Sequence, residues 1–329
     1  MSSPHLTYPS AKVQVDDAAL RESKRRVRRQ DSRLLWTFWS FVGPLVLGLL
    51  VFTYIPIIWG FLLSFFEARA TVFPTQFVGI QNYITMLQDQ SFIQSLVTFI
   101  VFACFIVPTT FILALGLALL VNSISFARGF FRSVFFIPTA CSYVVASLIW
   151  KMSIFNGLPY GLANVLRGMF NLGAIDWVGT AHPPYYWIVL VTVRLWLQLG
   201  FYIILFIAGL QDIPRELYEA AFVDGARSGW QTFRHITFPL LRNTSVAVLL
   251  LNLIAAFQAF DEFYNIMGGF VGSSGNAGLA RSPLVYLYGI AFGSQNFGLG
   301  SAGAMILTIL ILLFTLVQGR LFGFGKSNF

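Results

Sequence analysis

Long apolar runs separated by short polar segments dominate the chain after residue 33. Six of these runs reach or exceed the roughly 20 residues that a helix needs to cross a bilayer core. They are approximately Leu34–Phe66, Phe92–Val121, Phe130–Met152, Tyr185–Leu210, Thr244–Met267 and Leu299–Phe322. The pattern therefore predicts an all-α integral membrane protein in which residues 34–322 form one transmembrane domain of six helices.

Composition agrees with this prediction. Hydrophobic residues make up 57% of the chain and charged residues only 10%, a balance that excludes an ordinary soluble domain. The formal net charge is +8, which in a soluble protein would suggest nucleic-acid binding. Because the basic residues cluster beside the apolar runs, no nucleic-acid partner is predicted.

The distribution of Lys and Arg predicts the orientation of the chain. Residues 1–33 are polar and carry eight of these side chains directly before the first apolar run. That run has the length of a full span, so the tail is expected to be retained and not cleaved as a secretory signal. The positive-inside rule places both termini, with the short tail 323–329, and the 211–243 segment in the cytoplasm. The basic N-terminal tail is expected to contact lipid headgroups weakly.

The segment 211–243 is the longest polar interruption after the N-terminal tail. Pro214 marks a helix start, and Glu219 places negative charge near that start, where the helix dipole favours it. Gly225 can close the helix with a positive φ, and the Ser-x-x-Gln sequence of Ser228–Gln231 has the form of a capping box for a second helix. Two short helices are therefore predicted, either as a solvated loop or as a surface for another protein.

In the same segment Glu219 is followed by Ala220, Ala221 and Gly225, and the segment closes with Ile236 and Pro239. With these residues it resembles the EAA loop in the membrane subunits of bacterial ATP-binding-cassette (ABC) importers, in the form found in the carbohydrate-uptake branch. Phe238 stands where the family has Leu, and the stretch between the Gly and the Ile is one residue longer than usual. Further similar stretches cover most of residues 34–322, among them Gly79–Tyr83, Phe131–Pro138, Ala208–Pro214 and Phe257–Asp261.

The resemblance implies the fold of a type I ABC importer permease and uptake of a carbohydrate, most simply a di- or oligosaccharide, by alternating access. The residues it assigns to coupling with an ATPase subunit are Glu219, Ala220, Ala221, Asp224 and Gly225. The implied partners are a second homologous permease, two ATP-binding subunits and an extracytoplasmic solute-binding protein in a bacterial or archaeal plasma membrane. ATP and Mg²⁺ would be held by the ATPase subunits, and this chain would hold no cofactor. Glycerol-3-phosphate or another small solute is the alternative within the class.

Residues for catalysis or metal binding are scarce. Gly323–Ser327 contains a Gly-Lys-Ser sequence, but the phosphate-loop pattern requires Gly where Arg320 stands and a helix after Ser327. The chain is therefore not expected to hydrolyse ATP. Cys104 and Cys141 fall in separate predicted spans and are expected to pack as small apolar residues. The three His residues lie in separate segments, so no metal site is predicted.

Polar side chains inside the spans mark a candidate transport path, because a charge at membrane depth costs roughly 2.5–3.5 kcal/mol on insertion scales. Together with aromatic residues that could stack on sugar rings, the candidate solute contacts are Tyr143, Trp150, Arg194, Trp196, Tyr202, Asn252, Phe257, Gln258 and Asp261. Each could instead serve helix packing, and Arg194 and Asp261 could form a structural ion pair. An ion-coupled secondary transporter would also use polar residues in its spans, but it would have no need for an EAA loop.

Overall fold

The structure is a computed structural model that describes residues 35–124, 126–226, 229–268 and 278–322. Both predicted tails, 1–33 and 323–329, lie outside the described residues. The chain divides into two compact units, Met1–Gly60 and Phe61–Phe329, and each is described by itself.

The described part of the first unit is helical. A helix begins at residue 35, passes through the π-helical turn η1 (Leu50–Tyr54) and continues into α2 (Ile55–Leu63), which ends in the second unit. The resulting helix, Leu35–Leu63, has 29 residues and is apolar enough to cross a membrane. The first predicted span is therefore confirmed.

The second unit is helical apart from a small hairpin of β1 (Phe66–Glu67) and β2 (Gln76–Phe77). Three long helices confirm the second, fourth and sixth predicted spans to within three residues at each end: α4 (Gln90–Ser123), α8 (Tyr186–Gln211) and α14 (Phe297–Phe322). The shorter helical elements between them are α3 (Gln81–Gln88), α7 (Leu162–Met169), α9 (Arg215–Val223), α13 (Pro283–Tyr288) and η7 (Gly289–Gly293).

The prediction of a continuous third span is wrong. α5 (Arg128–Phe136) and the short helix η2 (Ile137–Ala140) are followed, after a break, by α6 (Tyr143–Ile149) and η3 (Trp150–Ile154). The two halves are bent by 93°. Pro138 lies in the first turn of η2, where its ring removes a backbone donor and prevents the α-helix from continuing.

The fifth predicted span, Thr244–Met267, is also interrupted. Its helix α12 covers Arg242–Phe257, and residues 258–260 are not helical before the chain resumes in a turn that includes η5 (Phe263–Met267). At its other end α12 meets a second helical segment at a bend of 68°. The elements of that segment are α10 (Trp230–Thr232), η4 (Phe233–Thr237) and α11 (Phe238–Leu240). If each bent pair counts as one span, the described residues contain up to six spans.

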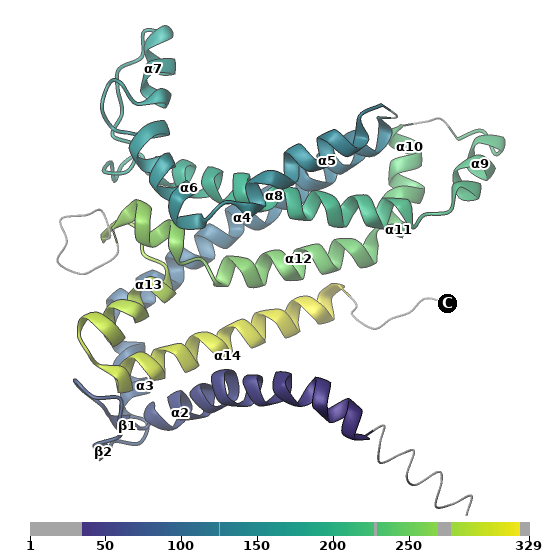
Figure 1. Cartoon of the computed structure of the whole chain (residues 1–329). Helices are drawn as coiled ribbons and strands as arrows, with labels where there is room; N and C mark the ends of the chain where they lie inside the picture. Colours follow the sequence, from purple (N-terminus) through teal and green to yellow (C-terminus); the bar gives the residue numbers. More distant parts are fainter. Residues whose placement is uncertain (1–34, 125, 227–228, 269–277, 323–329) are drawn as a thin grey trace, which may run out of the picture. The chain divides into compact units, whose positions relative to one another are not determined.

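Small residues allow close packing around α8, which packs along α4 at the centre of the second unit (Figure 1). A Cβ atom on Gly200 would lie only 1.9 Å from the backbone oxygen of Phe135, so the approach of α5 to α8 requires glycine at this position. On α14, a Cβ atom on Gly303 would lie 2.3 Å from Cδ2 of Leu287 in α13. These contacts fit the use of small residues at interfaces between membrane helices.

Two buried apolar clusters follow each other along the helices. The first occupies the beginning of α4 and α8 and includes Phe102 and Leu197. The second occupies their far ends and includes Ala114 and Ile203. α12 contributes to both clusters. Between the two clusters these same helices carry buried polar side chains.

Candidate functional site

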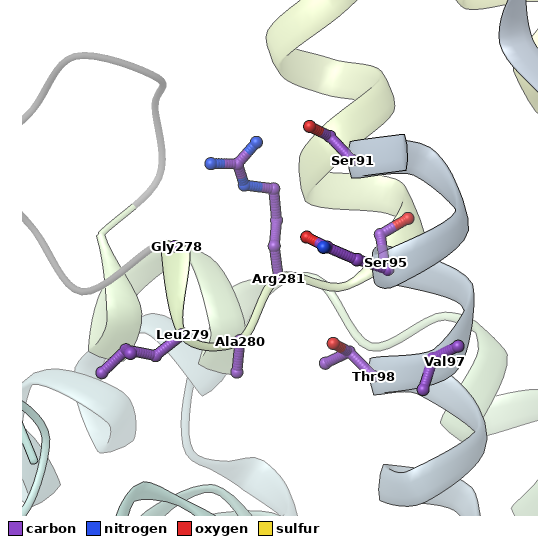
Figure 2. A pocket seen from close by; sticks show the side chains of 9 residues that line it. Ser91, Ser95, Val97, Thr98, Gly278, Leu279, Ala280 and Arg281 are labelled. Atoms are coloured by element: carbon purple, nitrogen blue, oxygen red, sulfur yellow. The ribbon is translucent and has the colours of Figure 1, made fainter. Parts of the chain in front are cut away.

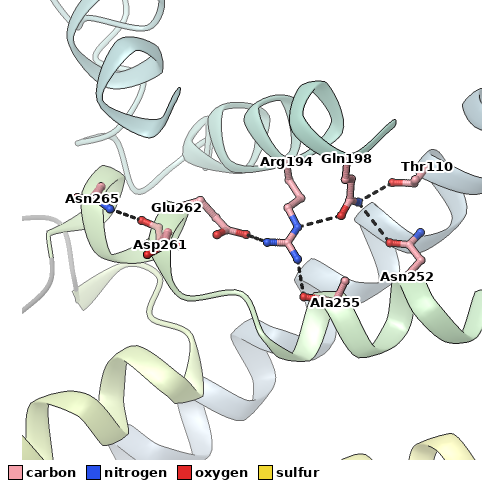
Figure 3. A network of polar contacts seen from close by, with 8 residues as sticks. All are labelled: Thr110, Arg194, Gln198, Asn252, Ala255, Asp261, Glu262 and Asn265. Atoms are coloured by element: carbon pink, nitrogen blue, oxygen red, sulfur yellow. Dashed lines mark hydrogen bonds and ion pairs between the residues drawn. The ribbon is translucent and has the colours of Figure 1, made fainter. Parts of the chain in front are cut away.

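We call the polar side chains between the two apolar clusters the polar layer (Figure 3). Its members come from α4, α8, α12 and the turn after the break in the fifth span: Thr110, Arg194, Gln198, Asn252 and Glu262, each no more than 6% exposed. The side-chain amide of Gln198 donates to Oγ1 of Thr110 at 3.1 Å and to Oδ1 of Asn252 at 3.3 Å. Asn252 in turn donates to the backbone oxygen of Val107 at 3.2 Å. These hydrogen bonds take the place of those that the buried polar groups would otherwise make with water.

The guanidinium of Arg194 connects four parts of the chain. Nη1 donates to Oε1 of Glu262 at 2.9 Å, and Nε donates to Oε1 of Gln198 at 3.0 Å. Nη2 donates to the backbone oxygen of Ala255 near the end of α12. The guanidinium carbon also lies 4.9 Å from the ring centre of Tyr143 in α6, a distance suited to a cation–π interaction. Arg194 therefore ties α8 to both sides of the break in the fifth span and to the second half of the bent third span.

Arg194 pairs with Glu262 and not with Asp261, the alternative that the sequence suggested. Figure 3 shows Glu262, not Asp261, pointing at Arg194, while the backbone oxygen of Asp261 accepts from the side chain of Asn265 at 2.7 Å. Neighbouring residues in a helical turn project about 100° apart, so only one of two adjacent carboxylates can face α8. Thr110 was not singled out from the sequence, because α4 carries several hydroxyl side chains and the adjacent Thr109 gives the same local signal.

Two of the predicted solute contacts pack inside the chain. Tyr202 and Phe257 are each 3% exposed, and they belong to the second and the first apolar cluster respectively. The ring of Phe257 stacks on that of Phe99 with centroids 3.9 Å apart. In this conformation neither aromatic face is open to a sugar.

Other predicted solute contacts remain accessible. The rings of Trp150 and Trp196 lie 5.1 Å apart, and Trp150 Nε1 donates to Oγ1 of Thr192 at 3.1 Å. Trp196 and Gln258 are exposed, whereas the half-buried candidates are Tyr143, Trp150 and Asp261. The predicted set thus divides into accessible residues, members of the polar layer, and the two residues packed in the apolar clusters.

The predicted pair of short helices lies at the end of the second unit where α8 ends (Figure 1). α9 ends at Val223, and Gly225 has φ of +85°, the left-handed conformation expected for a glycine that closes a helix. The second helix begins at Trp230 with Gly229 as its N-cap, and the structure does not test the predicted capping box. Ser228 itself lies outside the described residues.

α9 presents an exposed surface of mixed chemistry. Tyr218 attaches the helix to the bundle, since its hydroxyl lies 3.1 Å from Oγ1 of Thr237 and its ring packs against the second apolar cluster. Of the predicted coupling residues, Ala221 is half-buried, and the exposed ones are Glu219, Ala220, Asp224 and Gly225. The exposed large apolar side chains of α9 are Leu217, Phe222 and Val223. Exposed apolar groups on a segment outside the spans are typical of a contact surface for another protein.

The described residues contain no group of three or more His, Cys, Asp or Glu side chains placed to hold a metal ion. Cys104 and Cys141 are free thiols. Both are exposed and belong to neither apolar cluster, so the expectation that they pack as small apolar residues is wrong.

Comparison with known proteins gives a consistent result. Residues 91–322 match the family model described as binding-protein-dependent transport system inner membrane component. The chain is 34% identical over 290 residues to the arabinooligosaccharides transport system permease protein AraP of Bacillus subtilis, a match that covers 88% of this chain and 89% of the relative. It is 32% identical over 284 residues to the trehalose/maltose transport system permease protein MalF of Thermococcus litoralis, covering 86% and 92%.

A solved structure has the same fold. It is the bacterial alginate ABC transporter in complex with an alginate pentasaccharide-bound periplasmic protein, one chain of which matches with a TM-score of 0.75. The match covers 88% of this chain and 95% of that chain. At 20% identity, the likeness shows the fold alone.

Proposed function

The chain belongs to the family of binding-protein-dependent transport system inner membrane components, and on this basis we propose that it is the membrane-spanning permease of an ABC importer for a carbohydrate. The family is one of transport permeases and not of catalytic subunits. Relatives named for arabinooligosaccharides and for trehalose or maltose support a sugar as the solute, of di- or oligosaccharide size.

The observation that carries this proposal is the exposed surface of α9. It combines an acidic residue, two alanines and apolar side chains beside the left-handed Gly225, at one end of the bundle. In the proposed complex an ATPase subunit covers this surface and moves α9 when the ATPase dimer closes. Tyr218 and Thr237 would pass that movement to the bend between α11 and α12.

The polar layer would take part in the switch between outward-open and inward-open states. Packed interfaces have discrete arrangements and do not deform continuously, so the hydrogen bonds of this layer would exchange partners during the switch. Arg194 and Asn252 would act there as positioning residues. The proposed solute contacts are the residues that keep accessible polar or aromatic surface: Tyr143, Trp150, Trp196, Gln258 and Asp261.

The proposed assembly contains a second homologous permease, two ATP-binding subunits and an extracytoplasmic solute-binding protein. The periplasmic protein in the solved alginate transporter complex supports the last of these. ATP and Mg²⁺ would be held by the ATPase subunits. Both termini would face the cytoplasm of a bacterial or archaeal cell, because most Lys and Arg residues lie on their side of the membrane.

Purification with the co-encoded subunits tests the proposal. ATPase activity is measured in the presence of the binding protein and each of four sugars: maltotriose, arabinotriose, trehalose and trigalacturonate. We expect an ATPase subunit to copurify and at least one of these sugars to raise turnover. A chain that purifies without any ATPase subunit would contradict the proposal.

A further inference from the structure

A cavity of about 440 Å³ opens beside the first turns of α4 (Figure 2). The segment 278–281, just before α13, forms its other wall. The far end of α4, at Ser123, lines a groove together with Trp230 of α10. The cavity and the proposed coupling loop therefore lie at opposite ends of the same helix. The volume of the cavity is within the roughly 300–1,000 Å³ typical of small-molecule sites.

The α4 wall of the cavity is a stripe of hydrogen-bonding side chains. Ser91, Gln94, Ser95 and Thr98 have the spacing that places residues on one face of a helix. Ser95 is 2% exposed and donates to the backbone oxygen of Phe92 at 2.6 Å, which leaves its lone pairs free to accept. The side chains of the other three members make no hydrogen bond to any described residue. The stripe can therefore both donate to and accept from a ligand rich in hydroxyl groups.

Arg281 lines the opposite wall, and Figure 2 shows its side chain running alongside the first turns of α4. Its guanidinium carbon lies 5.9 Å from the ring centre of Tyr286. Within the described part of the chain, no carboxylate lies within 4.0 Å of this guanidinium. A guanidinium holds its donors in a rigid fork that matches two neighbouring oxygen atoms. The cavity thus has one cationic anchor facing a row of neutral polar groups.

The two walls are held together by side chains outside the cavity. Asp89 caps α4 by accepting from the backbone N–H of Ser91 at 2.8 Å, and its second oxygen accepts from the hydroxyl of Tyr286 in α13. Burial, and then the hydrogen bond to Asp89, raise the pKa of Tyr286, which extends to higher pH the range in which this hydroxyl donates. This bond ties the start of α4 to α13, the helix that follows Arg281, and the hydroxyl of Tyr186 in α8 donates to the backbone oxygen of Leu279 in the wall segment at 3.4 Å. Both walls are therefore attached to the bundle, and such preorganisation lowers the entropic cost of binding.

We propose that this cavity is a saccharide subsite at the outer mouth of the transport path. The hydroxyl and amide groups of the stripe bind sugar hydroxyls, and Arg281 binds two adjacent oxygens, either of neighbouring hydroxyls or of a carboxylate. The subsite receives the solute before it enters the membrane-embedded path. This inference rests on the carbohydrate import proposed above and on the orientation given by the Lys and Arg distribution.

Protection of an introduced thiol tests the subsite directly. Ser91→Cys is made in a Cys104→Ala, Cys141→Ala background, because both native thiols are exposed and would react as well. The assembled transporter, without binding protein, is treated with a water-soluble maleimide in the presence and absence of each of the four sugars. We expect a sugar that supports uptake to slow the modification of Ser91→Cys several-fold. If trigalacturonate protects more strongly than the neutral sugars, Arg281 binds a carboxylate of the sugar. If the neutral sugars protect as well as trigalacturonate, Arg281 binds sugar hydroxyls.

Matched variants separate binding from unrelated effects. Arg281→Ala removes a charged hydrogen-bond donor, so the sugar concentration for half-protection is expected to rise about tenfold or more. Arg167→Ala is the control, since Arg167 lies on α7 and donates to the backbone oxygen of Gly173. Ser294→Cys, an exposed position just after η7 that lines neither the cavity nor the proposed solute contacts, should gain no protection from sugar.

Two results would overturn the subsite. The first is normal uptake of a sugar that gives no protection at Ser91→Cys. The second is protection that requires the binding protein and is independent of sugar, which would make the cavity a docking surface for that protein. Absence of uptake by the unmodified transporter with all four sugars would instead count against the proposed function, so the two failures can be told apart.

Discussion

Arg194 Nη1 and Glu262 Oε1 lie 2.9 Å apart, and their side chains are only 7% and 0% exposed. The pair joins α8 to the turn that follows the break in the fifth span. Oε2 of Glu262 has no hydrogen-bond partner among the described residues, so Arg194 is the main support of this buried carboxylate. A charge left alone at membrane depth costs several kcal/mol, so each side chain depends on the other.

Removing one partner should therefore destabilise the bundle strongly. Arg194→Met leaves a buried carboxylate unpaired and frees the oxygen of Ala255, for an expected loss of about 3–5 kcal/mol. The measurement is the thermal unfolding midpoint of the detergent-purified chain. The double variant Arg194→Met, Glu262→Gln should recover much of the loss, because no charge is then left unpaired.

The exposed ion pair between Arg69 and Glu67 is the matched control. Its atoms lie 3.7 Å apart, and the side chains are 71% and 46% exposed, so solvent screens the attraction. Arg69→Met should leave the unfolding midpoint nearly unchanged. Equal effects of Arg194→Met and Arg69→Met would contradict the structural importance of the buried pair.

Gly200 offers a test of the contact between α5 and α8. An added Cβ would meet the backbone oxygen of Phe135 at 1.9 Å, so Gly200→Ala must push the two helices apart, at an expected cost of about 1–3 kcal/mol. Gly116 on α4 has open space around the same position, and Gly116→Ala should be neutral or slightly stabilising. A lower unfolding midpoint for Gly116→Ala than for Gly200→Ala would show that the helices are not packed as described.

Gly225 tests the turn after α9. At φ of +85° any other residue is strained, by roughly 1–2 kcal/mol, and the side chain of Gly225→Asp also projects into the proposed ATPase contact. We expect Gly225→Asp to abolish sugar-stimulated ATPase activity while membrane insertion is retained. Gly168→Ala on α7, where the added Cβ meets open space, should leave that activity intact. If sugar stimulated the ATPase activity of Gly225→Asp as strongly as that of the unmodified protein, the turn after α9 would have no role in coupling.

Substitution of Trp196, one of the two accessible tryptophans, tests whether the pair contacts the solute. Trp196→Leu removes one of two rings that lie 5.1 Å apart, and it should raise the sugar concentration for half-maximal uptake several-fold with little change in stability. Phe201→Leu, an exposed residue on another face of α8, serves as the control. If both substitutions shifted the uptake curve equally, Trp196 would have no specific solute role.

The sequence predicted most of the helices because membrane spans leave a local signal. Apolar runs of sufficient length located α4, α8 and α14, and Pro214 with Gly225 bounded α9 correctly. The breaks in the third and fifth spans were missed for different reasons. Pro138 lies within an apolar run long enough for a span, and membrane helices can tolerate proline, so it does not by itself signal a break. Gln258-Ala259-Phe260 contains neither Gly nor Pro and gives no local sign of a break.

The polar layer was only partly predictable, because its geometry depends on the tertiary structure. Arg194 and Asn252 stood out as polar residues in apolar runs. Whether Asp261 or Glu262 pairs with Arg194 depends on how the chain turns after residue 260. The identity of these two residues does not determine that turn. The stripe of Ser91, Gln94, Ser95 and Thr98 gained meaning only when the fold placed Arg281 opposite it.

ATP-driven sugar uptake in proteoliposomes tests the central claim most directly. The complete transporter is reconstituted with ATP inside, the binding protein and radiolabelled sugar outside, and no ion gradient. The account predicts accumulation that requires ATP and is lost in Glu219→Lys, which reverses the charge on the exposed face of α9, but kept in the control Glu67→Gln. Accumulation without ATP, driven by an imposed ion gradient and unaffected by Glu219→Lys, would contradict it.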